Sequence, residues 1–159
     1  MNCSCERCQG LCRNKPGWFL PEQIKVLAQR LGLSIDALFR NHLTIDAVLV
    51  ERAGSPVATY VLAPAMVGKP TGEVSDPEAR GACVWFRDGQ CAIHEAKPRE
   101  CREVDHTTTP RDGDLLRAAI LEQWRPHKKL VQDLYGRKLK PPQSLKDTYR
   151  AAKKARPGG

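Results

Sequence analysis

The sequence predicts an α+β fold, in which two short N-terminal helices precede short antiparallel strands and a hairpin, and further helices follow at the C-terminal end. Two Val- and Thr-rich stretches in the first half of the chain are typical of strands. Apolar residues recur at helical spacing on both sides of them. All seven cysteines lie before residue 102, so the two ends of the chain are expected to differ in chemistry.

Two helices are expected near the N-terminus. Within PEQIKVLAQRLG, Pro21 suits the first turn of a helix and Gly32 suits its end. The apolar residues of this stretch fall on one face: Ile24, Leu27, Ala28 and Leu31. In the following SIDALFRNHL, Ser34 is the expected N-cap, and three apolar residues face inward: Ile35, Leu38 and Phe39.

Strands are expected next, in IDAVLVER and PVATYVLAP, with the turn sequence AGSP between them. A Gly/Pro-rich loop follows, and CVWFRDGQCAIH then predicts a hairpin with Asp88 and Gly89 at its turn. Beyond Pro110 the periodicity becomes helical, with Pro126 starting a second segment and Gly136 ending it. The apolar set of these helices is Leu115, Leu116, Ala119, Ile120, Trp124, Leu130, Leu134 and Tyr135. SLKDTYRAAKKA predicts a last, highly charged helix.

Several classes of protein do not fit the composition. No apolar run of signal-peptide length follows Met1, and no run of about 18 apolar residues exists, so we expect a cytoplasmic protein without a membrane span. Disulfides are disfavoured because cytoplasmic thiols stay reduced and because seven cysteines cannot all pair. No hydrolase triad, phosphate loop, dinucleotide fingerprint or HExxH motif is present, so an enzyme is the less favoured interpretation.

The spacing of the cysteines indicates a metal site. Cys5 and Cys8 are separated by two residues, which lets both sulfur atoms approach one ion at about 2.3 Å, and Cys12 can join them. The Asp-Gly turn folds Cys91 back toward Cys83, and Cys101 follows shortly after. We therefore expect the small domain to be stapled by a metal. Its candidate ligands are Cys5, Cys8, Cys12, Cys83, Cys91 and Cys101.

Cys3 is a weaker candidate, because it lies close to an end of the chain that is expected to fray. A ligand role and an exposed thiol are both open for it. We predict that replacing it leaves metal binding unchanged.

Three stretches together resemble the YkgJ-type cysteine-cluster family, which is described as chelating zinc or iron. They are CERCQGLC, PEQIKVLAQRLGLSIDALFRNHL and CVWFRDGQCAIHEAKPRECR, and the resemblance covers about residues 3–105. The six candidate ligands match family cysteines by position. The framework around them matches at Phe86, Ile93, Pro98 and Arg102.

The chain also departs from the family pattern. Leu11 replaces one cysteine, Lys97 replaces an arginine and His94 replaces a tyrosine. His94 could restore a ligand, but on a hairpin it and Cys91 would point to opposite faces, which favours a packing role. Arg102 directly follows Cys101 in the matched motif, and we expect it to support the charged centre from outside the ligand set.

The residues leave the metal open between zinc and an iron–sulfur cluster. Tetrahedral zinc takes four ligands, and two zinc ions could share six thiolates. A [4Fe–4S] cluster takes four thiolates, and three close cysteines with one remote suit it. We place zinc ahead of the cluster. The main hypothesis is a structural metal centre in a protein that acts through interactions. The alternative is an iron–sulfur protein with a redox or catalytic accessory role.

The charge divides the chain into parts. Residues 1–105 carry equal numbers of acidic and basic side chains, whereas residues 106–159 carry 13 Lys and Arg against 5 Asp and Glu. We predict a metal-binding domain over residues 1–105, a helical extension packed on it over 106–136, and a basic, mobile tail over 137–159. The second alternative function follows from this tail, which could attach a metal-scaffolded module to RNA, DNA or an acidic protein.

Overall fold

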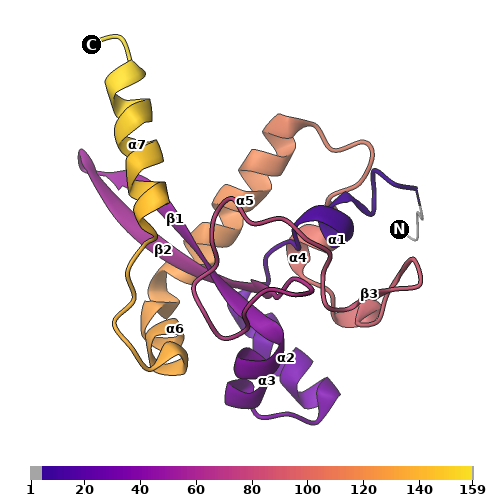
Figure 1. Ribbon diagram of the computed structural model, residues 1–159. Coiled ribbons are helices and arrows are strands. Elements are labelled where there is room, and N and C mark those ends of the chain that lie inside the picture. Colours follow the sequence, from indigo (N-terminus) through magenta and orange to yellow (C-terminus); the bar gives the residue numbers. More distant parts are fainter. Residues whose placement is uncertain (1–4, 159) are drawn as a thin grey trace.

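A long antiparallel hairpin organises the fold of the computed structural model, which describes residues 5–158 (Figure 1). β1 (Leu43–Arg52) pairs with β2 (Ser55–Pro64) in a register that sets Leu43 opposite Pro64. Ala53 and Gly54 connect the strands with φ angles of 49° and 78°, the conformation of a tight two-residue turn. This confirms the predicted pair of strands and places its turn where AGSP predicts it.

The two predicted N-terminal helices are present as α2 (Pro21–Leu31) and α3 (Ile35–His42). Their ends follow the local signals, since Gly32 takes the left-handed conformation and the Ser34 hydroxyl accepts a hydrogen bond from the Ala37 amide at 3.0 Å. One predicted inward residue is wrong. Leu31 is 38% exposed because it is the last residue of α2, where the helix leaves the core.

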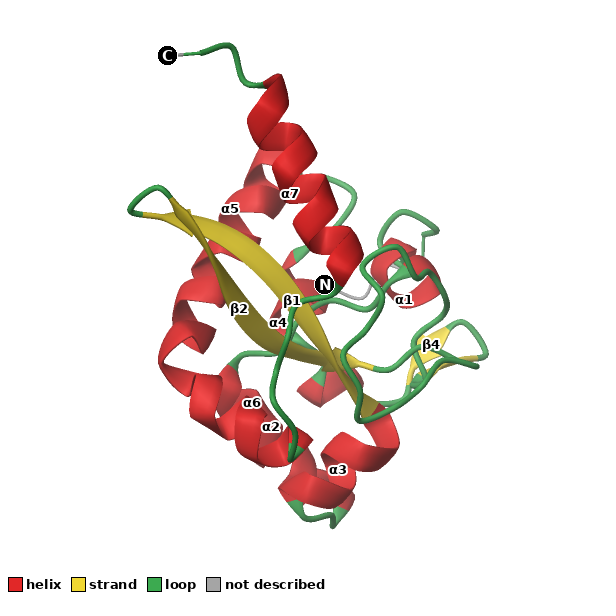
Figure 2. Cartoon of the chain, turned by 60° about the vertical axis from the view of Figure 1, so that its left-hand side comes forward, coloured by secondary structure: helices red, strands yellow, loops and turns green. Residues whose placement is uncertain are grey.

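The C-terminal helices cover one side of the hairpin. α5 (Pro110–Trp124) and α6 (Lys128–Tyr135) are joined by the short helix η2 (Arg125–His127), and both contact β2 (Figure 2). The Trp124 indole donates a hydrogen bond of 2.6 Å to the Phe19 carbonyl inside the core. Residues of these helices therefore share one apolar core with the N-terminal part: Phe19, Leu62, Ile120, Trp124 and Val131.

The N-terminal half of α5 extends beyond this core. Leu115, expected to be part of the apolar face, is 59% exposed, whereas Ile120 and Trp124 further along the helix are fully buried. The buried residues of α5 lie in its second half, and the helix contacts β2. The apolar face that the sequence predicts is therefore longer than the part of the helix that is buried.

Short elements gather the cysteines on one side of the hairpin, where Figure 1 shows α1, α4 and β3 close together. The predicted hairpin is present as β3 (Phe86–Arg87) and β4 (Gln90–Cys91). Three further elements were not predicted: α1 (Gly10–Asn14), the short helix η1 (His94–Ala96) and α4 (Arg99–Glu103). Backbone hydrogen bonds from Gly81 to Asn14 and from Cys83 to Cys12 tie the two cysteine-bearing segments together.

The last helix, α7 (Gln143–Ala155), lies beside the far end of the hairpin and contacts β1 (Figures 1 and 2). None of its residues is buried. The segment before it is held more closely, because Leu139 is buried and Arg137 pairs with Glu73 at 2.6 Å. The mobility of residues 137–159 stays a prediction. Across residues 5–158, no helix has both the length and the hydrophobicity needed to cross a membrane.

Candidate metal centre

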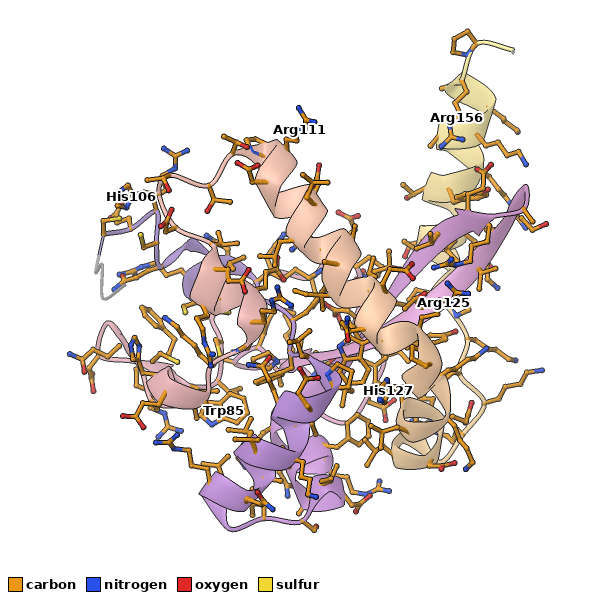
Figure 3. The ribbon with its side chains drawn as sticks, turned by 180° about the vertical axis from the view of Figure 1, so that it is seen from behind. Trp85, His106, Arg111, Arg125, His127 and Arg156 are labelled. Atoms are coloured by element: carbon orange, nitrogen blue, oxygen red, sulfur yellow. The ribbon has the colours of Figure 1, made fainter. Side chains whose placement is uncertain are left out.

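Cys5, Cys8 and His106 form a compact group of metal-ligating atoms. The Cys8 sulfur lies 3.3 Å from His106 Nδ1 and the Cys5 sulfur lies 3.9 Å from it, and all three donor atoms are within 4.8 Å of one another. Ligands of a tetrahedral zinc ion stand about 3.5–3.8 Å apart, as bond lengths near 2.0–2.3 Å require. The group is thus spaced to hold one metal ion, as Figure 3 illustrates with His106 beside the N-terminal segment.

Two local turns aim these side chains. The Cys8 amide donates a hydrogen bond of 3.4 Å to the Cys5 sulfur, so the turn between the two cysteines faces both thiols toward one point. His106 stands in the loop after α4, where the Asp105 carboxylate accepts hydrogen bonds from the Thr107 amide and hydroxyl. These bonds, the hydroxyl first, lower the pKa of Asp105. The turn that they close fixes the residue between them, which is His106.

The four other described cysteines form a second, inner group. Cys12 lies on α1, Cys91 on β4, Cys101 on α4, and Cys83 just before the hairpin. The Cys101 thiol donates a hydrogen bond to the Cys12 sulfur, and the charge of Cys12 acts on both Cys83 and Cys91. Within the described chain, the spacing of 4.8 Å is met by the first group and not by these four.

Burial and hydrogen bonding give the inner thiols different pKa values. The hydrogen bond from Cys101 lowers the pKa of Cys12 to about 7 against burial, and the positive charge of Lys97 adds to the effect. Burial raises the pKa of Cys83 to about 12 and also raises that of Cys91. The pKa of Cys101 is raised because its proton is shared with the Cys12 sulfur, and burial adds to this.

Backbone amides point at the inner sulfur atoms. Cys83 receives hydrogen bonds from the amides of Trp85 and Phe86, and Cys91 receives one from Ile93. Cys101 receives one from the Gly17 amide at 3.3 Å. Such donors stabilise the charged thiolate, which is the form that binds metal. These amides offset only part of the effect of burial, because the pKa values of Cys83, Cys91 and Cys101 stay raised.

Gly17 is needed for the approach to Cys101. A Cβ atom at this position would lie 2.8 Å from Glu100 Cβ and 3.0 Å from the Cys101 sulfur. No side chain larger than hydrogen fits there without a shift of the chain. The contact places the segment after α1 directly against α4, so the sulfur of Cys101 is covered by backbone.

The grouping of the candidate ligands in space differs from their grouping along the sequence. Cys12 was expected with Cys5 and Cys8, but it lies beside Cys101. His94 is exposed in η1 and belongs to neither group, and the Arg102 guanidinium donates to the Glu95 carbonyl at 3.4 Å. Cys3 lies outside the described residues.

His106 is the residue that sequence reasoning missed. The stretch DHTTTPRDGD predicts a polar loop and a helix cap, and the Thr109 hydroxyl does cap α5 by accepting from the Asp112 amide. His106 follows Cys8 by 98 residues, so no spacing rule connects them. The available signal was the Asp105–His106 pair itself, a histidine held in a tight polar turn soon after Cys101.

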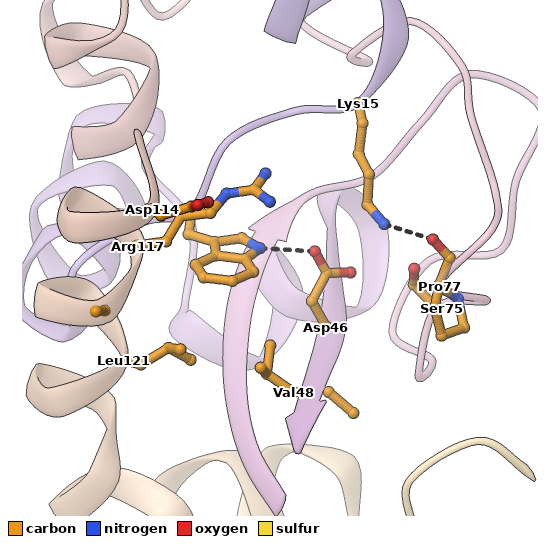
Figure 4. A pocket seen from close by; sticks show the side chains of 11 residues that line it. Lys15, Asp46, Val48, Ser75, Pro77, Asp114, Arg117 and Leu121 are labelled. Atoms are coloured by element: carbon orange, nitrogen blue, oxygen red, sulfur yellow. Dashed lines mark hydrogen bonds between the residues drawn. The ribbon is translucent and has the colours of Figure 1, made fainter. Parts of the chain in front are cut away.

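A small cavity of about 310 Å³ lies between β1 and α5 (Figure 4). The buried Asp46 carboxylate accepts a hydrogen bond of 2.8 Å from the Trp18 indole, and the Lys15 ammonium donates to the Pro77 carbonyl. The Arg117 guanidinium lies over the Trp18 ring and pairs with Glu100 at 2.6 Å. Lys15, Asp46 and Arg117 thus have partners within the protein, and the cavity is at the small end of the range for ligand pockets.

Comparison with known proteins gives no match. No family model, no curated protein and no solved structure is similar to the chain. The site is therefore interpreted from its own geometry and chemistry.

Proposed function

We propose that the protein binds metal at two neighbouring centres and that these centres are mainly structural. The observation that carries the proposal is the meeting of Cys5, Cys8 and His106 at metal-ligand spacing, although His106 is about 100 residues away from both cysteines in the chain. A metal shared by such distant segments closes a long loop and stabilises the folded state.

The inner cysteines are proposed as the second centre. Cys12, Cys83, Cys91 and Cys101 come from four separate segments, and all but Cys12 receive amide hydrogen bonds of the kind that stabilise thiolates. In this proposal, small movements on binding bring the four sulfur atoms to ligand distances. The positive charge of Lys97, which already acts on Cys12 and Cys91, offsets part of the charge of a four-thiolate centre.

Zinc is the proposed metal. A mixed set of thiolate and imidazole is typical of zinc, and two separate ligand sets explain why the chain carries more cysteines than one tetrahedral ion uses. A [4Fe–4S] cluster in the inner group is the second candidate. The four thiolates that bind such a cluster stand further apart than the ligands of a single ion, because the cluster is larger than one ion. The sulfur atoms of the inner group are likewise spaced more widely than the donor atoms of the outer group. That cluster would give the protein a redox or catalytic accessory role.

Membership of the YkgJ-type cysteine-cluster family is part of the same proposal. It is supported by the matching positions of six cysteines and by a structure that gathers four of them around one hairpin and two short helices. The departure at Leu11 is compatible with the proposed ligand sets, because Leu11 is one residue before Cys12 on α1 and neither set needs a thiol there.

The test is the metal content of protein purified without oxygen, measured by elemental analysis and by absorption. We expect about two zinc ions per chain and no broad absorption near 400 nm, the region where iron–sulfur clusters absorb. Cys8→Ser and His106→Ala should each lose one ion, because each removes a ligand of the outer centre. Cys83→Ser should lose the other.

His94→Ala is the matched control for His106→Ala, because His94 is also exposed but joins neither cysteine group. It should keep all of its metal. Cys3→Ser should keep it as well, and loss of one ion from this variant would instead make Cys3 a ligand of the outer centre. If the purified protein is brown and contains iron and sulfide, the metal is an iron–sulfur cluster and not zinc. Parent protein that stays free of metal after incubation with zinc or iron would overturn the proposal.

A further inference from the structure

We propose that the outward face of α7 is a docking surface for the phosphate backbone of a nucleic acid, bound without regard to base sequence. The metal centres have no part in this inference, which rests on how α7 is attached and on which side chains it turns to solvent. Residues 137–159 contain eight Lys and Arg residues and a single acidic residue.

One face of α7 is turned toward the hairpin. The Tyr149 hydroxyl donates a hydrogen bond of 3.1 Å to the Glu51 carboxylate, and the Arg156 guanidinium donates to the same oxygen at 3.1 Å. Leu145 packs against the edge of the core on the same side. Leu145 and Tyr149 are four positions apart and therefore share one face of α7, and Arg156 directly follows the end of the helix. The helix is thereby oriented on β1.

The remaining face carries a row of positive charge, formed by Lys146, Arg150, Lys153 and Lys154. These residues recur at intervals of four, seven and eight, which places them on one side of a helix. The Arg150 guanidinium forms a salt bridge of 3.7 Å with the Asp147 carboxylate. By contrast, Lys146, Lys153 and Lys154 take part in none of the salt bridges found within residues 5–158. Lys146 is half-buried and the other three are exposed. The row is therefore available for an anionic partner.

The length of the row fits a phosphate backbone. From Lys146 to Lys154 the helix rises about 12 Å at 1.5 Å per residue. One strand of a DNA duplex advances about 3.4 Å per phosphate along the helix axis, so roughly three to four phosphates lie along this length. Regularly spaced anions of this kind suit the row better than the irregular carboxylates of an acidic protein surface.

The contact should not distinguish bases. Tyr149 is the only aromatic residue of the segment, and its hydroxyl is engaged with Glu51 on the face that packs on the hairpin. Without an aromatic ring on the cationic face, stacking on single-stranded bases is not available there. Affinity then comes from charge alone and depends steeply on salt.

The experiment measures binding of the full-length protein to a fluorescein-labelled DNA duplex of about 20 base pairs by anisotropy, between 50 and 200 mM NaCl. Four phosphate contacts give a slope of about −3.6 in log K against log salt, which is roughly a 150-fold loss of affinity over this range. The variant K146Q/R150Q/K153Q/K154Q should lose about 3.6 units of that slope and at least tenfold in affinity at 50 mM NaCl.

The matched control is K25Q/K69Q/R87Q/R111Q, which removes the same net charge from exposed positions on four separate segments. It should bind within twofold of the parent. An equal loss in both variants would mean that net charge, and not α7, drives binding. A parent slope shallower than about −1, or equal competition by poly-L-glutamate at the same charge concentration, would also overturn the proposal. If the α7 variant does not fold, deletion of residues 143–159 serves the same test.

Discussion

Cys12 and Cys83 show at the scale of single residues how the same side chain acquires opposite properties. The Cys101 hydrogen bond lowers the pKa of Cys12 to about 7, whereas burial raises that of Cys83 to about 12. The thiolate is the reactive form of cysteine. In protein stripped of metal, the charged form of Cys12 therefore appears as the pH rises through about 7, while Cys83 stays protonated.

We predict that iodoacetamide labels Cys12 of the metal-free protein at least tenfold faster than Cys83 at neutral pH, because only Cys12 has an appreciable thiolate fraction. The Cys12 rate should rise between about pH 6 and 8 and then level off, since its pKa lies below the ordinary value. Peptide mass spectrometry after timed quenching measures both rates. Cys101→Ala removes the donated hydrogen bond and should shift the rise of the Cys12 rate toward higher pH. Faster labelling of Cys83 would contradict the assignment.

The contact between the Gly17 segment and α4 decides stability at the scale of elements. The Glu100 amide donates to the Trp18 carbonyl, and the buried Glu100 carboxylate accepts from the Trp18 amide at 2.9 Å. The Gly17 amide meets the Cys101 sulfur in the same contact. Two segments more than 80 residues apart in the chain are thus held together by hydrogen bonds that backbone amides donate.

We predict that Gly17→Ala lowers the free energy of unfolding by about 1–3 kcal/mol, because its Cβ would overlap Glu100 and Cys101. It should also reduce metal bound at the inner centre, since Cys101 must move. Urea unfolding and elemental analysis measure the two effects. The control is Gly10→Ala in α1, where no heavy atom lies within 4 Å of the new Cβ and stability should stay equal or increase slightly. The same loss in both variants would refute the packing argument.

The whole molecule combines one shared core with a peripheral helix. The core includes residues from both sides of position 106, among them Phe19, Leu62 and Trp124. At the C-terminal end, Leu139 is buried and Arg137 pairs with Glu73, but α7 contributes no buried residue. Full burial therefore ends at Leu139, and α7 adds only the partly buried Leu145 at the edge of the core.

We predict that deleting residues 143–159 changes the free energy of unfolding by less than about 1 kcal/mol, because α7 contributes no fully buried residue and its polar contacts lie near the surface. Deleting residues 137–159 should cost about 2–5 kcal/mol, as expected for loss of a buried leucine. Leu139→Ala in the full chain isolates the second effect, and urea unfolding compares all three. Equal stability of the two deletions would show that Leu139 contributes nothing.

Local signals account for the elements that the sequence predicts well. Ser34, Gly32 and Gly136 determine helix ends through their own side chain or backbone conformation. The hairpin turns at Ala53–Gly54 and Asp88–Gly89 depend on residues that are adjacent in the chain. The predictions that Leu31 and Leu115 are buried were wrong, because the apolar face of a helix does not show how much of its length packs against the rest of the protein.

By itself, then, the sequence determined the order of the longer helices and strands, the hairpin turns and the cysteines as the candidate ligands, because each depends on residues a few positions apart. Only the tertiary structure decided which candidates meet. His106 approaches Cys5 and Cys8, and Cys12 turns to Cys101, because packing of the core brings together segments that lie 80 to 100 residues apart. Such encounters depend on the packing of the whole chain, which no spacing rule of the sequence describes.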